Sequence, residues 1–249
     1  RPTLGILLLA FPIVHGDRSL EVLKKLLAQW RVLLFALLAC ICVLAIQSFL
    51  WHAQTGHWIE NGYRGEGFYW TRPRIFKVLF SIRRGFFVWT PVMIAVLAGI
   101  VLLWKKDRIR SAWTLVYFCA ITYVFSAWWI WYYGGGFGHR AFVDHYPVLL
   151  MPFALWYDRA APLMRRSFFA FLVLASGWHL MQFWQHNHGI LHDVSMDRDK
   201  YAWAFMRSGA ADKEQLGGND QEPPYHPNGM RLVADETCDF ERPCTIWGG

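Results

Sequence analysis

Charged side chains are scarce in this chain. Asp, Glu, Lys and Arg make up only 17% of its 249 residues, whereas soluble domains usually carry about 25%. Hydrophobic residues account for 55%, and they include 15 Trp and 19 Phe. A soluble core of this length does not need so much apolar surface. A bilayer does, because each spanning helix takes roughly 20 apolar residues, so the composition predicts an integral membrane protein.

Familiar catalytic and nucleotide-binding motifs are also lacking. The sequence contains no Gly-x-Ser-x-Gly elbow, Walker loop, dinucleotide fingerprint or His-Glu-x-x-His pair. The formal net charge is +7, but the basic residues follow a membrane-topology pattern and accompany no nucleic-acid-binding motif. We therefore expect no nucleic-acid partner.

Six apolar segments occur along the first 184 residues. They lie at 3–15, 31–50, 87–104, 111–132, 143–157 and 167–184. Helices satisfy their own backbone groups inside hydrocarbon, so the sequence predicts an all-α, polytopic transmembrane bundle over 1–184 with about six spanning helices. The segment 143–157 contains Pro147 and Pro152, which predicts a kink or an entry below the membrane surface.

The two ends of the chain differ from this pattern. The first apolar stretch, 4–14, follows Arg1 without the features of a signal peptide, and we expect it to be part of a helix that begins further upstream. The tail 185–249 is polar, with one short helix expected within 197–208.

Basic residues in three short connections predict the orientation. Under the positive-inside rule these connections are cytoplasmic. The loops 51–86 and 133–142 and the tail are then outside. The basic residues concerned are Arg18, Lys24, Lys25 and Arg31; Lys105, Lys106, Arg108 and Arg110; and Arg159, Arg165 and Arg166.

The outer loop 51–86 is itself basic, against the topology signal. Within it, a helix over 74–84 would place Arg74, Lys77, Ser81 and Arg84 on one face. Such an interfacial helix lies in the membrane plane with its basic face toward anions. An equally open interpretation is that these cations reach ordinary lipid phosphates by snorkelling.

The strongest local signal is WWIWYYGGGFGHRAFVDHYP at 128–147. Its glycines at 134, 135, 136 and 138 allow a tight turn whose backbone N–H groups form an anion-binding concavity. His139 and Arg140 follow, and an arginine suits bidentate phosphate binding. Arg140 and Asp144 are also spaced to pair at a helix start, which would not exclude a phosphate role.

Other polar clusters carry weaker signals. Glu60 and Glu66 could serve as a base or a metal ligand, but neither has a partner by spacing. A divalent metal is possible at a histidine-rich turn that is otherwise simply solvated, and no cofactor is assigned. The turn contains His186, His188, His192, Asp193, Asp197 and Asp199.

The five cysteines lie in two kinds of sequence, a polar tail and apolar runs. In an external tail, Cys238 and Cys244 would be positioned to form a disulfide. The other three, Cys40, Cys42 and Cys119, lie in apolar runs and are expected to pack as small apolar residues.

Two stretches together carry a family resemblance. FYWTRPRIFKVLFSIRRGFFVWTPVM (68–93) and WWIWYYGGGFGHRAFVDHYPVLLMPFA (128–154) resemble the later half of bacterial multi-pass proteins related to the dolichyl-phosphate-mannose protein mannosyltransferases. These are membrane glycosyltransferases of the C-type fold. The resemblance covers about residues 50–195.

The resemblance implies an enzyme of the bacterial cytoplasmic (inner) membrane that transfers a sugar from a polyprenyl phosphate to an acceptor on the outer face. It also implies that a set of basic residues surrounds the donor phosphate. The superfamily's catalytic acid lies in an earlier external loop, so no catalytic residue is carried over. The base is expected in that earlier loop, with Asp144 as an outside possibility. The phosphate-binding set is Arg72, Arg74, Arg84, His139 and Arg140.

Two other functions stay open. The chain could be an accessory or structural subunit of a larger membrane complex, bound to partner subunits and without chemistry of its own. It could also be a redox subunit whose His145 and His179 ligate a haem, with His52 or His139 as substitutes.

Overall fold

The computed structural model describes residues 2–60, 67–192 and 196–209. Within these ranges the chain is helical apart from loops and one isolated β-bridge, so the all-α prediction is confirmed there. Cys238 and Cys244 lie outside the described residues. In chain order the helices are η1 (Pro2–Ala10), α1 (Phe11–His15), η2 (Gly16–Arg18), α2 (Ser19–Ala28), α3 (Trp30–Thr55), α4 (Ile75–Phe80), α5 (Phe86–Trp89), η3 (Pro91–Met93), α6 (Ile94–Leu103), α7 (Arg108–Ala127), η4 (Arg140–His145), α8 (Tyr146–Asp158), α9 (Pro162–Asn187) and α10 (Arg198–Ala204).

Three helices, α3, α7 and α9, are long and apolar enough to cross a membrane. They indicate a membrane protein, but the prediction of about six spans is not supported. The other three apolar segments are short or interrupted. The segment 3–15 is mostly the tighter 3-10 helix η1, and the segment 87–104 is divided among α5, η3 and α6.

Local backbone chemistry explains these interruptions. Thr90 leaves the helical region at φ −133° and ψ 68°, and Pro91 follows without an N–H to continue the hydrogen-bond ladder. The segment 143–157 enters through the 3-10 helix η4 and continues as α8, which has 13 residues and Pro152 inside it. The predicted irregularity at this entry is therefore confirmed.

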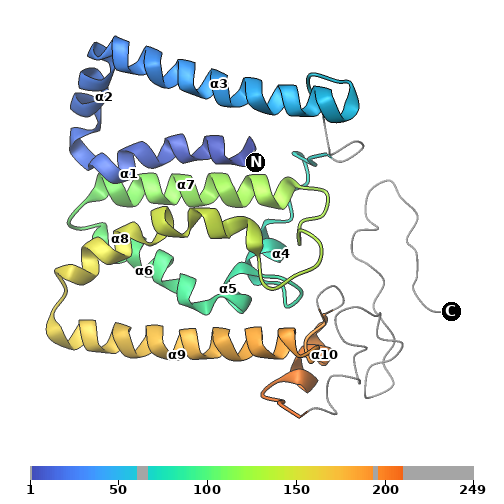
Figure 1. The fold of residues 1–249 in the computed structure, drawn as a ribbon. Helices are drawn as coiled ribbons and strands as arrows, with labels where there is room; N and C mark the ends of the chain where they lie inside the picture. Colours follow the sequence, from blue (N-terminus) through green and yellow to red (C-terminus); the bar gives the residue numbers. More distant parts are fainter. Residues whose placement is uncertain (1, 61–66, 193–195, 210–249) are drawn as a thin grey trace.

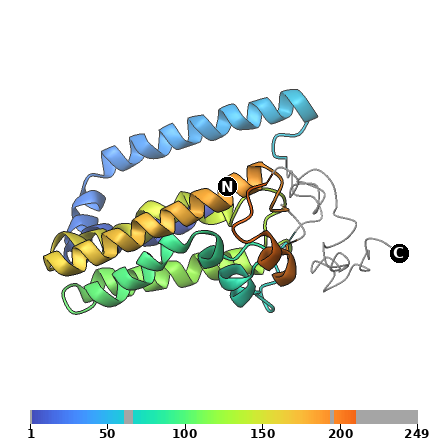
Figure 2. The same ribbon diagram turned by 90° about the horizontal axis from the view of Figure 1, so that it is seen from below.

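The long helices α3, α7 and α9 run roughly along one direction, whereas α2 runs across it, and η1 and α1 lie alongside α7 (Figures 1 and 2). The three short basic connections all lie at one end, called here the basic-loop end. The segments 67–86 and 128–142 and the helix α10 lie at the other, called the glycine-loop end. The alternation expected from the basic residues is thus present in the fold. The short helix expected within 197–208 is α10.

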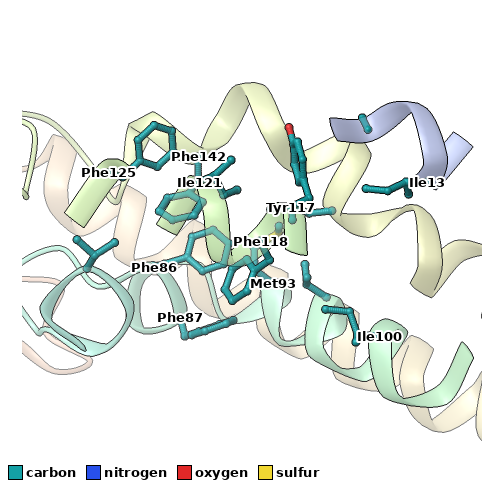
Figure 3. Packing of buried hydrophobic residues seen from close by; sticks show 14 of the residues in the cluster. Ile13, Phe86, Phe87, Met93, Ile100, Tyr117, Phe118, Ile121, Phe125 and Phe142 are labelled. Carbon is teal, nitrogen blue, oxygen red and sulfur yellow. The ribbon is translucent and has the colours of Figure 1, made fainter. Parts of the chain in front are cut away.

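Aromatic side chains form the core between α5, α7 and η4 (Figure 3). The ring centroids of Phe86 and Phe142 are 4.3 Å apart, and those of Phe125 and Phe142 are 4.9 Å apart. Helices α6 and α8 pack closely against each other at Gly99. A Cβ on this residue would come within 2.5 Å of the Phe153 backbone nitrogen. This core fixes the ends of α5 and α7 that carry the polar loops.

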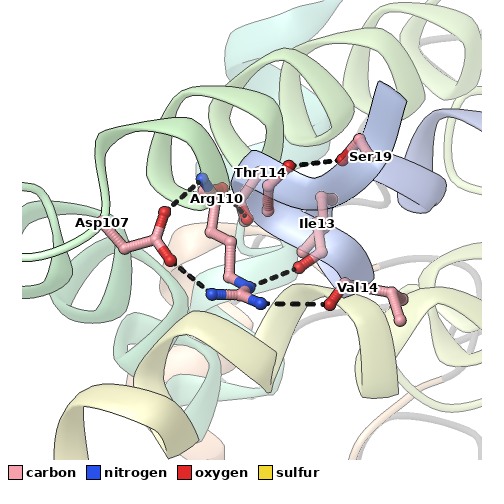
Figure 4. Close-up of polar contacts among 7 residues, drawn as sticks. Ile13, Val14, Ser19, Asp107, Arg110 and Thr114 are labelled. Atoms are coloured by element: carbon pink, nitrogen blue, oxygen red, sulfur yellow. Dashed lines mark hydrogen bonds and ion pairs between the residues drawn. The ribbon is translucent and has the colours of Figure 1, made fainter. Parts of the chain in front are cut away.

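A polar contact joins α1 to α7 at the basic-loop end (Figure 4). Arg110 donates from Nε to the Ile13 carbonyl at 3.1 Å and from Nη2 to the Val14 carbonyl at 3.3 Å. Its Nη1 lies 2.5 Å from Asp107 Oδ2, and Asp107 also caps α7 by accepting from the Arg110 backbone N–H. Carbonyls at a helix C-terminus have no partner within their own helix, and Arg110 supplies one.

Candidate anion-binding site

The loop that follows α7 lies beside the segment 67–74. Backbone hydrogen bonds join them, from Tyr69 N–H to the Ala127 carbonyl at 2.6 Å and from Arg74 N–H to the Ser126 carbonyl at 3.0 Å. Trp129 N–H donates back to the Gly67 carbonyl at 3.1 Å. These bonds bring Arg72 and Arg74 to the same end of the bundle as the glycines. There Arg72 is exposed and Arg74 is half-buried.

The interfacial helix expected over 74–84 is shorter than predicted. The helix α4 ends at Phe80, and Ser81 is extended at φ −66° and ψ 142°. The Ser81 hydroxyl accepts from the Arg83 backbone N–H at 3.1 Å, a local bond that competes with continuing the helix. Arg84 therefore does not share a helix face with Arg74, as the spacing had suggested.

Instead, Arg84 turns inward under the glycine-rich loop. Its side chain is 2% exposed, and Nη1 lies 3.7 Å from the position that a Cβ on Gly136 would occupy. On the exposed side, Arg140 Nη2 lies 3.9 Å from the corresponding position on Gly134. Both glycines have positive φ, 69° and 124° for residues 134 and 136, which side chains with a Cβ rarely adopt. Two guanidinium groups thus lie close to the loop backbone, one buried and one exposed.

His139 is also brought to this site, but as a neutral ring. It is 2% exposed, and Nε2 lies 3.1 Å from the Trp131 carbonyl oxygen. Since a carbonyl only accepts, the proton is on Nε2 and Nδ1 keeps a lone pair. Burial lowers the His139 pKa to about 3; the bond to Trp131 opposes this shift, and the charge of Arg84 adds to it.

This protonation state limits what His139 can bind. At neutral pH the ring cannot supply the positive charge that the expected phosphate role assumed, and a lone pair on Nδ1 repels a phosphate oxygen. Nδ1 is buried and finds no hydrogen-bond partner within the described part of the chain. A ligand hydroxyl or N–H is the chemistry that complements it.

Two basic residues here were not singled out from the sequence. Arg83 stacks on the Tyr132 ring, with Cζ 3.7 Å from the centroid. Lys200 is buried, with Nζ 3.4 Å from Asp197 Oδ2. Burial lowers the Lys200 pKa, Asp197 opposes this shift and Arg83 adds to it. The only sequence signal for Arg83 was its place beside Arg84, and Lys200 lay unremarked in the short helix of the tail.

Two glutamines hold α10 against α9. Gln182 donates to the Tyr201 hydroxyl at 2.6 Å. Gln185 Nε2 donates to the carbonyls of Ala204 and Arg207, each at 2.8 Å. Both glutamines are buried, and buried amides are costly unless hydrogen-bonded. These bonds therefore hold α10 in place at the glycine-loop end.

Asp144 and the proposed haem ligands lie in separate surroundings. Asp144 is exposed on η4, next to buried His145. His145 Nδ1 is 2.6 Å from the Tyr117 hydroxyl in the core, whereas His179 Nδ1 donates to the Trp89 carbonyl at 2.7 Å and its ring packs on Phe137. The structure therefore does not show these two histidines facing a common space. His52 lies in the last turn of α3, and its ring stacks on Trp58.

The histidine-rich turn likewise shows no metal-binding arrangement. Within the described ranges, no three His, Cys, Asp or Glu side chains are close enough to hold an ion. His188 interacts with the Trp184 carbonyl at 2.8 Å, and His192 is buried. Glu60 is half-buried, while Glu66 and Asp193 lie outside the described residues.

No protein-family model, curated protein or solved structure matches this chain. The geometry at the glycine-loop end therefore carries the functional argument. It combines the guanidinium groups of buried Arg84 and exposed Arg140, a turn with three glycines at positive φ, and a neutral hydrogen-bond acceptor.

Proposed function

We propose that this chain is a glycosyltransferase-like protein of the bacterial cytoplasmic membrane that binds a polyprenyl-phosphate-linked sugar at its glycine-loop end and transfers the sugar to an acceptor. In this proposal the glycine-loop end, with the tail, faces outward and the basic-loop end faces the cytoplasm. The observation that carries it is the closeness of the glycine loop to Arg84 and Arg140, because turns with free backbone N–H groups beside arginines suit a phosphate.

The chemistry of the loop also suits the sugar. A phosphate held by Arg140 and the loop backbone places the first sugar next to it. In this proposal the loop that buries His139 Nδ1 moves aside on binding, and the hydroxyl on the neighbouring carbon then donates to this atom. A bare lipid phosphate has no such donor, so the neutral histidine favours the glycosylated lipid. The transfer step also requires a base to take the acceptor hydroxyl's proton, and Asp144 is exposed at this same end.

Aromatic side chains at the glycine-loop end support a position at headgroup level. Phe68 packs on Trp70 and Trp128, with ring centroids 4.7 and 4.8 Å away. Tryptophan rings are enriched at the level of lipid headgroups. A phosphate at this level is only partly hydrated, so each charge-assisted hydrogen bond is worth about 1.5–3 kcal/mol.

The test is native mass spectrometry of the detergent-solubilised protein with lipid extraction. A glycosylated polyprenyl phosphate should co-purify, and Arg140→Gln should remove it. Arg108→Gln is the matched control, because Arg108 is also exposed but lies at the basic-loop end. Recovery of bulk phospholipid alone from the unmodified protein would count against the proposal.

An accessory role is a second candidate, favoured by one observation. Helix α3 has 26 residues with an unbroken apolar run at 32–46, and none of its residues is buried, so the rest of the described chain does not cover it. A partner helix in the same membrane would explain that exposure. If chemical cross-linking in native membranes joins α3 to another subunit while no lipid-linked sugar is found, the accessory role replaces the transferase proposal.

A further inference from the structure

We propose that α2 is an amphipathic anchor that binds the surface of the cytoplasmic leaflet, with anionic phospholipid headgroups as its partner. Helix α2 lies at the basic-loop end, opposite the glycine loop. The inference does not depend on the transferase activity, but it does require that the basic-loop end faces the cytoplasm.

The sequence of α2, SLEVLKKLLA, divides into two faces. At 100° per residue, its five large apolar residues fall within an arc of about 160°. Glu21, Lys24 and Lys25 fall on the opposite side, where Lys25 pairs with Glu21 at 2.6 Å. The apolar residues are Leu20, Val22, Leu23, Leu26 and Leu27. Such a two-faced helix is suited to lie at an interface between water and hydrocarbon.

No residue of α2 is buried in the protein. Leu20 is 72% exposed and Leu27 is 60% exposed, so the apolar face is open. Ten residues are also too few to keep a helix stable in water without support. The helix therefore requires a surface to cover its leucines, and the described chain does not supply one.

The orientation of α2 identifies that surface. In Figure 1, α2 runs across the direction shared by α3 and α7. Since α3 is long and apolar enough to span a bilayer, a helix transverse to it lies in the membrane plane. Only Gln29 separates the two helices, so α2 sits at the depth where the span begins.

The residues at the start of α3 indicate the headgroup level. Trp30 is exposed, and the Arg31 guanidinium lies 5.6 Å from the centre of its ring. An exposed tryptophan with an arginine is typical of the membrane–water interface. Arg18, Lys24 and Lys25 then lie at the same level, where cytoplasmic leaflets carry anionic lipid. A lipid surface fits both the open leucines and the cations beside them, and it is continuous with the exposed surface of α3.

Hydrogen–deuterium exchange of the full chain in nanodiscs tests this inference. We expect the backbone amides of α2 to exchange about tenfold more slowly in discs containing phosphatidylglycerol than in discs of phosphatidylcholine alone. The double substitution Leu23→Glu and Leu27→Glu should abolish the protection in both lipids. Lys24→Gln with Lys25→Gln should remove only the dependence on phosphatidylglycerol.

Two features keep this experiment decisive. Protection of α7 in the same spectra shows whether each variant is folded. Glu21→Gln, which removes the partner of Lys25, should keep or increase the protection in phosphatidylglycerol. The inference is overturned if α2 in the unmodified protein exchanges equally fast in both lipids, or if its protection appears only in discs that hold two copies of the chain. Loss of lipid-linked sugar binding at the other end would leave these results unchanged, so the two proposals fail separately.

Discussion

Arg84 Nη1 lies 3.7 Å from the place that a Cβ on Gly136 would occupy, on a backbone with φ 124°. The distance leaves room for a methyl group, but the dihedral angle does not favour one. The glycine therefore lets the turn pass close to the buried guanidinium in a backbone conformation that other residues rarely adopt.

Gly136→Ala should strain the loop by about 1–2 kcal/mol, because a Cβ is disfavoured at positive φ. Binding of a glycosylated polyprenyl phosphate should weaken by about tenfold as the loop shifts away from Arg84. A fluorescent-lipid displacement titration measures the effect. Gly135→Ala is the matched control, since Gly135 is exposed and is not among the glycines with positive φ. Equal affinities for the two variants would contradict the assignment of the loop.

His139 should make the folded state sensitive to acid. Its pKa is lowered to about 3 in the fold, against about 6.5 when unfolded. The unfolded chain therefore binds up to one more proton between about pH 3 and pH 6.5, and stability falls as the pH drops through this window, by up to about 1.4 kcal/mol per pH unit.

Thermal unfolding in detergent at pH 5 and pH 7.5 measures this contribution. His139→Gln should reduce the difference between the two pH values. His188→Gln, at an exposed histidine, should leave the difference as it is. If both variants behave alike, the buried neutral state of His139 is wrong.

Arg110→Gln should destabilise the basic-loop end. It removes the donors to the Ile13 and Val14 carbonyls and the partner of Asp107. A loss of about 1–3 kcal/mol is expected, visible as a lower midpoint of thermal unfolding. The same change at Arg108, which is exposed, should alter the midpoint little, while lipid-linked sugar binding should survive both changes in the folded fraction.

Gln185→Leu should release α10 from the end of α9. The substitution conserves size but removes the donor to the Ala204 and Arg207 carbonyls. Amides in 198–204 should then exchange faster with deuterium, whereas those of α7 should keep their protection. Asn187→Leu, at an exposed position on the same helix, is the control. Unchanged exchange in α10 would show that the glutamine does not hold it.

Long apolar runs made the long helices predictable from the sequence, whereas the short helices carry no such signal. α3 and α9 include the predicted segments 31–50 and 167–184, because uninterrupted apolar runs have few alternatives. The length of α4 was overestimated, because the spacing of the basic residues alone placed Arg84 on a helix face. In the structure, the Ser81 hydroxyl and the close approach of Gly85 to the Ser81 backbone end the helix.

The sequence pointed to the loop and its arginines, and phosphate binding there stays a prediction. The glycine run and its neighbouring arginines identified the loop, because few other residues tolerate such a turn. The neutrality of His139 could not be predicted, since it depends on burial and on the Trp131 carbonyl eight residues away. Lys200 reaches this end only because Gln182 and Gln185 dock α10, a contact between helices that local sequence does not reveal.

The most direct test of the central claim is photo-crosslinking with a polyprenyl-phosphate sugar that carries a photoreactive group beside the phosphate. After proteolysis, mass spectrometry locates the modified peptide. The account predicts labelling within 128–142 or 72–84, reduced by unlabelled glycosylated lipid and by Arg140→Gln. Labelling confined to α3 or to the basic-loop end, and unaffected by that competitor, would contradict it.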